Sequence, residues 1–124
     1  MAELESQTQD QSLTGLFNAI KFQIVGIAIA FMAGSVNYAF VLFADTKGHE
    51  IALSVPIVAT ALFTMVWGDA TLQSQVANIK DASSKTKETN AYKYIYAQPY
   101  ALLRVMNFSL AVALAASQLT ILFS

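Results

Sequence analysis

The chain has 124 residues, of which 56% are hydrophobic and only 12% are charged, and its formal net charge at pH 7 is −1. The length fits a single domain, but such an apolar composition excludes an ordinary small soluble domain. The balanced charge and the lack of a basic stripe exclude nucleic acid as a partner, and the lack of cysteine excludes disulfides and thiolate chemistry.

Three long segments contain no Asp, Glu, Lys or Arg: residues 22–44, 51–68 and 105–124. Each is close to the roughly 20 residues that a helix needs to cross a hydrocarbon core of about 30 Å. Because alternating strand patterns are absent, only helices can satisfy the backbone there. The sequence therefore predicts an all-α integral membrane protein, a single domain with three transmembrane helices in an antiparallel up-down bundle. A soluble bundle is the alternative, but so short a chain has little polar surface to cover three apolar segments.

The first predicted helix covers about residues 13–44. Residues 1–11 precede it as a flexible polar N-terminus, and Ser12 is the predicted N-cap. The leader carries more acidic than basic residues, which argues against a cleaved signal peptide. On a helical wheel, one face of this helix carries small and amide side chains: Gln23, Gly26, Ala30, Ala33, Gly34 and Asn37.

The second predicted helix covers about residues 51–81. The connection at residues 45–50 is short enough to force a hairpin, with Gly48 as a left-handed C-cap of the first helix. Beyond residue 68 the helix continues as a more polar extension. Its small and hydroxyl side chains can receive the small-residue face of the first helix: Ser54, Ala61, Thr64 and Gly68.

The third predicted helix covers about residues 99–124, after a polar and aromatic loop at residues 82–98 whose tyrosines fit an aromatic belt. This helix has two faces of small and polar residues, whereas a three-helix bundle needs only one. A face with two amides should not contact lipid, so we expect another protein to cover it. The alternative is that the amides lie shallow and bond to water or headgroups. The two faces are Ser109, Ala113, Ala116 and Thr120, and Asn107, Ala111, Ala115 and Gln118.

The distribution of basic residues predicts the orientation. Lys21, Arg104 and the four lysines between residues 80 and 93 flank one side of the predicted membrane, whereas only Lys47 lies on the other. Because basic residues concentrate in cytoplasmic flanks, we expect the N-terminus and the 82–98 loop in the cytoplasm and the C-terminus outside. The expected location is a plasma or inner membrane.

Few residues suggest chemistry. His49, the only histidine, is a weak candidate for contact with a haem or pigment, but a single imidazole without a second ligand favours a solvated loop residue. Asp69 is the acid closest to membrane depth, and we expect it at the inner interface, where Lys80 or water can serve it. The sequence shows no phosphate loop, catalytic triad or paired carboxylates, so we expect a non-enzymatic protein without a metal or cofactor.

The most economical functional hypothesis is a small accessory or structural subunit of a larger membrane protein complex, whose partners are the lipid bilayer and other membrane subunits or copies of itself. The alternative is a self-assembling membrane protein, either a virion membrane or coat protein or a holin-like pore former. A small four-helix exporter is disfavoured, because those depend on a Glu in the first helix and residues 22–44 contain no acid. The predicted helix-packing and interface residues are Gln23, Gly26, Ala30, Gly34, Asn37, Thr64, Gly68, Asn107, Ala111, Ala115 and Gln118.

Overall fold

The computed structural model describes the backbone of all residues and every side chain except those of Ser6, Gln9, Asp10, Ser12, Leu13, Leu16 and Ala19. The helices are α1 (Ala2–Phe43), α2 (Glu50–Lys80), α3 (Ser84–Lys87), α4 (Asn90–Tyr96) and α5 (Tyr100–Leu122), and the described backbone contains no strand. Three of them, α1, α2 and α5, include segments long and apolar enough to cross a membrane. The predicted all-α class with three long apolar helices is confirmed.

The N-terminal boundary of α1 differs from the prediction. The helix begins at Ala2 rather than near residue 13, so the polar N-terminus is helical where we expected an irregular segment. Its residues are mostly strong helix formers, and Glu3 and Glu5 in the first turn favour the positive end of the helix dipole. The side chain of the predicted N-cap, Ser12, lies outside the described residues, and the helix continues on its N-terminal side.

The predicted loop at residues 82–98 contains two short helices, α3 and α4. Each begins at a capping hydroxyl: Ser83 Oγ accepts from the Thr86 N–H at 3.2 Å, and Thr89 Oγ1 accepts from the Tyr92 N–H at 3.2 Å. The Tyr92 hydroxyl donates to the Ile79 carbonyl at 3.4 Å. This segment is therefore a small helical cap held against the end of α2, rather than the polar and aromatic loop that we expected.

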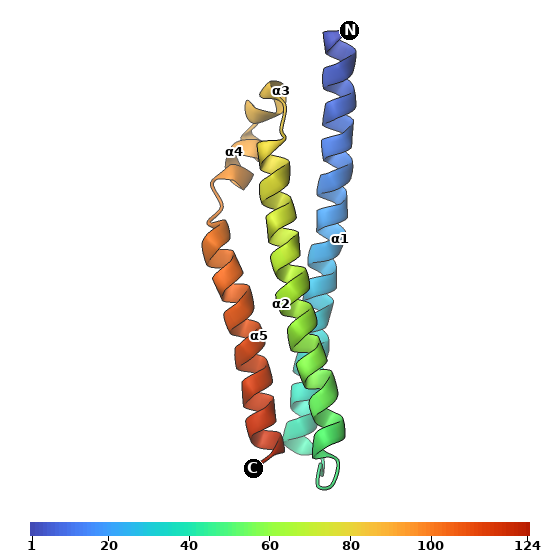
Figure 1. Ribbon diagram of the computed structural model, residues 1–124, viewed down its shortest axis with the longest axis vertical. Coiled ribbons are helices and arrows are strands. Elements are labelled where there is room, and N and C mark those ends of the chain that lie inside the picture. Colours follow the sequence, from blue (N-terminus) through green and yellow to red (C-terminus); the bar gives the residue numbers. More distant parts are fainter.

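The three long helices run alongside one another (Figure 1). In this view α1 descends, α2 returns upward and α5 descends again, so the N-terminus, α3 and α4 lie at one end, and the 45–50 connection and the C-terminus at the other. The central helix, α2, packs along both neighbours, whereas α1 and α5 make few contacts with each other. These two meet near the lower end, where Val41, Ile57 and Leu122 form an apolar cluster.

The connection between α1 and α2 closes with a tight turn. The His49 N–H donates to the Thr46 carbonyl at 3.0 Å, and Gly48 has a φ of +81°, as the third residue of a type II turn requires. The predicted left-handed conformation of Gly48 is confirmed. Its predicted role as the C-cap is wrong, because α1 ends at Phe43 and its C-cap is Ala44, in an extended conformation.

Candidate functional site

Polar contacts join the long helices, and we call the residues that make them the polar seam: Asn37, Thr64, Asp69, Arg104, Asn107 and Gln118. The Asn37 Nδ2 donates to the Gln118 Oε1 at 2.9 Å, linking α1 to α5. The Asn107 Nδ2 donates to the Thr64 carbonyl at 3.0 Å, linking α5 to α2. The Arg104 guanidinium binds Asp69 through two bonds of 2.5 and 3.1 Å, also linking α5 to α2.

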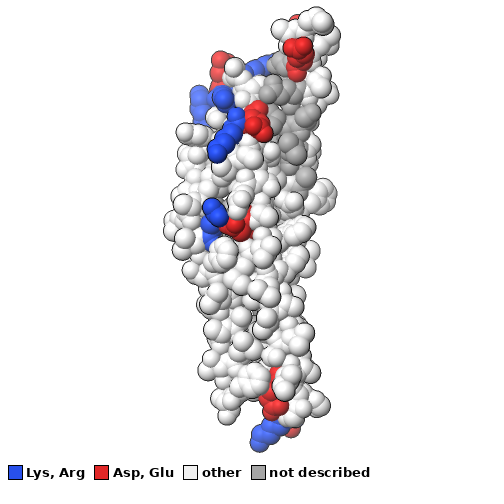
Figure 2. Space-filling model, viewed as in Figure 1, with Lys and Arg blue, Asp and Glu red and all other residues white. Residues whose placement is uncertain are grey.

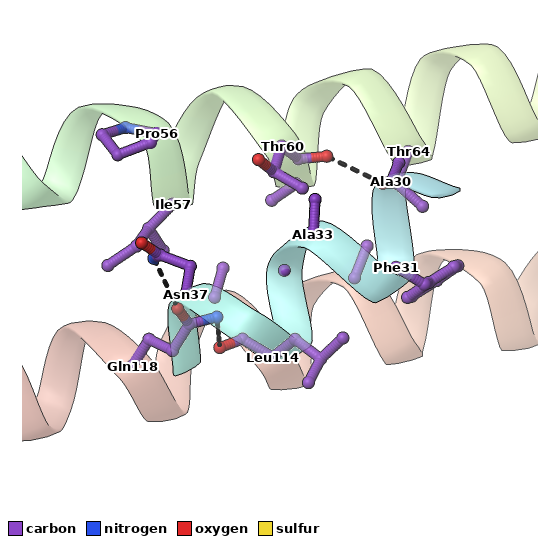
Figure 3. A pocket seen from close by; sticks show the side chains of 14 residues that line it. Ala30, Phe31, Ala33, Asn37, Pro56, Ile57, Thr60, Thr64, Leu114 and Gln118 are labelled. Atoms are coloured by element: carbon purple, nitrogen blue, oxygen red, sulfur yellow. Dashed lines mark hydrogen bonds between the residues drawn. The ribbon is translucent and has the colours of Figure 1, made fainter. Parts of the chain in front are cut away.

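The amide pair of Asn37 and Gln118 joins α1 to α5 beside α2. Gln118 is only 3% exposed, and its Nε2 also donates to the Leu114 carbonyl of its own helix at 3.1 Å (Figure 3). Gly34, one turn before Asn37, is buried, and a Cβ there would meet the Thr60 methyl group at 3.7 Å. This is an ordinary van der Waals distance, so α1 lies close to α2 at this level, as small residues permit between membrane helices.

The contact between Asn107 and Thr64 depends on Gly68. The Asn107 amide lies directly over this glycine, so that a Cβ at Gly68 would stand 2.6 Å from both the Oδ1 and the Nδ2. Thr64 is 2% exposed, and its hydroxyl donates to the Thr60 carbonyl at 2.8 Å. The Thr64 carbonyl accepts the bond from Asn107. The absence of a side chain at Gly68 provides the space that the Asn107 amide occupies.

The ion pair at the upper end of the polar seam corrects the expected partner of Asp69. Its carboxylate binds Arg104 in a bidentate manner and accepts a further bond from the Gln73 Nε2 at 2.6 Å, whereas we expected Lys80 or water. The side chains of Asp69 and Arg104 are 16% and 46% exposed. Composition could not indicate this pair, because it depends on the register between α2 and α5.

A cavity of about 220 Å³ lies between the three long helices (Figure 3). The polar seam contributes the Asn37–Gln118 pair and Thr64 to its lining. Most of the remaining wall consists of small side chains: Ala30, Ala33, Gly34, Thr60, Ala61, Ala111 and Ala115. The predicted small-residue faces of all three helices therefore meet around one space.

Two predicted packing residues of α1 lie outside these contacts. A Cβ at Gly26 would have no atom within 4 Å, so this glycine does not serve a close approach to a neighbouring described side chain. Gln23 is half-buried, and its Oε1 has no hydrogen-bond partner among the described residues. Of the predicted small residues of α1, Ala30 and Gly34 thus lie close to the other helices, whereas Gly26 does not.

The face of α5 that turns away from the other helices is not the one that we predicted. Asn107, Ala111, Ala115 and Gln118, which we expected to need a separate partner, face the other helices of the same chain; Ala111 is 2% exposed. The face that remains exposed is the other one: Ser109, Ala113, Ala116 and Thr120. A helical wheel separates two faces of a helix, but it does not show which of them turns toward α2.

The remaining candidate residue, His49, is exposed in the connection before α2. Among the residues whose side chains are described, no group of three His, Cys, Asp or Glu lies together as a metal site would require. The site as built offers amide pairing, one ion pair and close helix contact. No protein-family model, curated protein or solved structure matches this chain.

Proposed function

We propose that this chain is an integral membrane protein in which α1, α2 and α5 span the bilayer as an antiparallel up-down bundle. The observation that carries this proposal is a girdle without charged residues, formed by residues 22–44, 51–68 and 105–124. It lies between the Asp69–Arg104 pair and the 45–50 connection. From Asp69 to Glu50, α2 covers about 29 Å at roughly 1.5 Å per residue. This height matches a hydrocarbon core of about 30 Å.

The surface of the girdle supports the same proposal. Large apolar side chains on all three long helices are exposed, among them Val36 at 71%, Val66 at 67% and Val112 at 53%. On the face shown in Figure 2, charged residues gather toward the two ends and at the ion pair, and the surface between the pair and the lower tip is uncharged. A soluble monomer rarely exposes so extensive an apolar surface, whereas lipid tails would cover it at no cost.

The proposed orientation follows the basic residues. The end with α3 and α4 carries the lysines at 80, 85, 87 and 93, and Lys21 and Arg104 precede the uncharged segments of α1 and α5 on the same side, whereas Lys47 lies at the opposite end. We therefore place the N-terminus and residues 82–98 in the cytoplasm and the C-terminus outside, in a plasma or inner membrane.

Within that membrane, the proposed role is a non-enzymatic accessory or structural subunit of a larger complex. The outward face of α5 supports it, because Ser109, Ala113, Ala116 and Thr120 are small, exposed and aligned. Small residues allow another helix to approach closely in lipid, and the hydroxyl of Thr120 is already bonded to its own helix at 2.7 Å. The proposed partner surface is therefore the face of α5 opposite the one predicted from the sequence.

Single-cysteine crosslinking in native membranes tests this role, and the natural lack of cysteine makes the probes clean. We expect Ala113→Cys, on the exposed face, to crosslink to a different membrane protein, and Ala111→Cys, buried within the chain, to give at least fivefold less adduct. Adducts of this chain with itself alone would favour the self-assembling alternative, namely a coat protein or a holin-like pore former. Equal adducts from both variants, or none from either, would contradict a partner on α5.

A further inference from the structure

A second cavity, of about 320 Å³, lies between α1, the end of α2 and the α3–α4 cap. We call it the interfacial cavity. Its size falls in the range of small-ligand pockets. Most of its described lining is apolar and comes from α1 and α4: Phe17, Ile20 and Ile24, and Ala91, Tyr92 and Ile95.

The polar groups of the interfacial cavity are mostly occupied. The Thr89 hydroxyl donates to the Thr86 carbonyl at 2.7 Å and accepts from the Tyr92 N–H, and the Tyr92 hydroxyl donates to the Ile79 carbonyl. Lys21 is the one charged residue in the described lining, and it is exposed. An apolar cavity with a single ammonium group at its edge suits an amphiphile that has an apolar chain and an anionic head.

The position of the interfacial cavity along the helices narrows the class of amphiphile. Gln75, which lines it, lies six residues beyond Asp69, or about 9 Å along α2. Lys21 immediately precedes the uncharged segment 22–44. Because headgroups add roughly 5–8 Å on each side of the hydrocarbon core, Lys21 lies at the level of the cytoplasmic headgroups in the proposed membrane, and Gln75 lies near their outer edge.

The charge around the interfacial cavity selects an anionic headgroup. Between residue 80 and the end of α4 the chain carries four lysines and only two acids, Asp81 and Glu88, and Lys21 adds a fifth basic residue from α1. On the face shown in Figure 2, several basic side chains lie over this end of the molecule, beside acidic ones. Basic pockets on the cytoplasmic side of membrane helices recognise anionic lipid headgroups.

We propose that the interfacial cavity binds an acyl chain of an anionic phospholipid, with its phosphate paired to the Lys21 ammonium group. The site depends on the membrane insertion and orientation proposed above. It gives the α3–α4 cap a role in ligand binding, since Ala91, Tyr92 and Ile95 form one wall of the cavity. The bound phospholipid would fill the space between this cap and α1.

Lipid retention tests the site. The full-length protein is reconstituted in nanodiscs of equal parts phosphatidylcholine and phosphatidylglycerol, released into mild detergent and weighed by native mass spectrometry. We expect phosphatidylglycerol to be retained at least fivefold over phosphatidylcholine. Two variants should abolish the preference: Lys21→Gln, which removes the cation, and Ala91→Trp, which fills the cavity. Two matched controls should keep it: Lys47→Gln at the other end of the molecule and Ala97→Trp just outside the lining.

Equal retention of the two lipids by the native chain would overturn the site, and so would a loss of preference in the controls as large as in the two cavity variants. Helical circular dichroism verifies that each variant is folded. Resistance to alkaline carbonate extraction separates this site from the proposed function: a chain released by carbonate contradicts membrane insertion, whereas an integrated chain without lipid preference contradicts only the interfacial cavity as a lipid site.

Discussion

Gly26 and Gly68 are both helical glycines, yet their surroundings differ completely. At Gly68 the Asn107 amide occupies the space that any side chain would need, and at Gly26 a Cβ would meet no atom within 4 Å. Both residues fit a small-residue stripe equally well in the sequence. Only the positions of the neighbouring helices decide which glycine is required.

This difference predicts opposite outcomes for the same substitution. Alanine favours a helix over glycine by about 1 kcal/mol, so Gly26→Ala should be neutral or slightly stabilising. Gly68→Ala should be less stable than Gly26→Ala by about 1–3 kcal/mol, because the Asn107 side chain must leave the Thr64 carbonyl. Reversible unfolding in mixed detergent micelles measures both, and equal stability of the two variants would contradict the packing of Asn107 over Gly68.

The bond between Asn37 and Gln118 predicts an energetic coupling between α1 and α5. A double-mutant cycle with Asn37→Ala and Gln118→Ala should give a coupling of about 0.6 kcal/mol, and at most about 1.7 kcal/mol, as for polar bonds between membrane helices. As a control, Asn37→Ala and Thr120→Ala should be additive, because the Thr120 hydroxyl bonds to its own helix. Additivity in the first cycle, measured by the same unfolding assay, would show that the amide bond contributes nothing.

At the scale of elements, the ends of the helices were harder to predict than their central segments. The ends of α2 and α5 lie within about two residues of the predicted boundaries, because charged residues and turns mark them. The N-terminal end of α1 and the two short helices of the cap were missed. Their polar composition indicates that these segments are exposed to solvent, but it does not distinguish an irregular segment from a polar helix. In α3 and α4 the helical form begins at the capping hydroxyls of Ser83 and Thr89.

The connection between α1 and α2 provides a prediction at this scale. Gly48 adopts a left-handed backbone conformation, which costs an L-residue with a side chain roughly 1–2 kcal/mol. Gly48→Ala should therefore destabilise the hairpin by about that amount, whereas Gly48→Asn should cost less, because asparagine tolerates this region better. Thermal unfolding of the two variants compares them directly, and an alanine variant at least as stable as the asparagine variant would argue against the turn described for residues 46–49.

At the scale of the whole molecule, the central position of α2 determines which surfaces remain open. It packs along both α1 and α5. One face of α5 therefore contacts the other helices of the chain, and the opposite face is exposed. The proposed partner surface and the proposed lipid site both follow from this arrangement. One lies along the outward face of α5, and the other lies between α1 and the α3–α4 cap.

The proposed orientation predicts which residues are accessible from each side of the membrane. In intact cells, a membrane-impermeant maleimide should label His49→Cys, in the exposed connection, and should label Ser84→Cys only after permeabilisation. The unmodified chain has no cysteine and serves as the blank. The reverse pattern would invert the orientation, and labelling of both variants in intact cells would contradict three membrane crossings.

The helical class and the three long apolar helices follow from the amino-acid order alone, because an uncharged segment of about 20 residues is long enough to cross a membrane as a helix. The sequence also named Asn37, Gly68 and Gln118 as packing residues, although it assigned Gln118 to a face that a partner protein would cover. Which side chains meet is visible only in the folded chain. The Asp69–Arg104 pair and the inward turn of the Asn107 face depend on the rotation and register of α5 against α2. Those relations involve residues more than 30 positions apart, and a pattern within one helix contains no information about them.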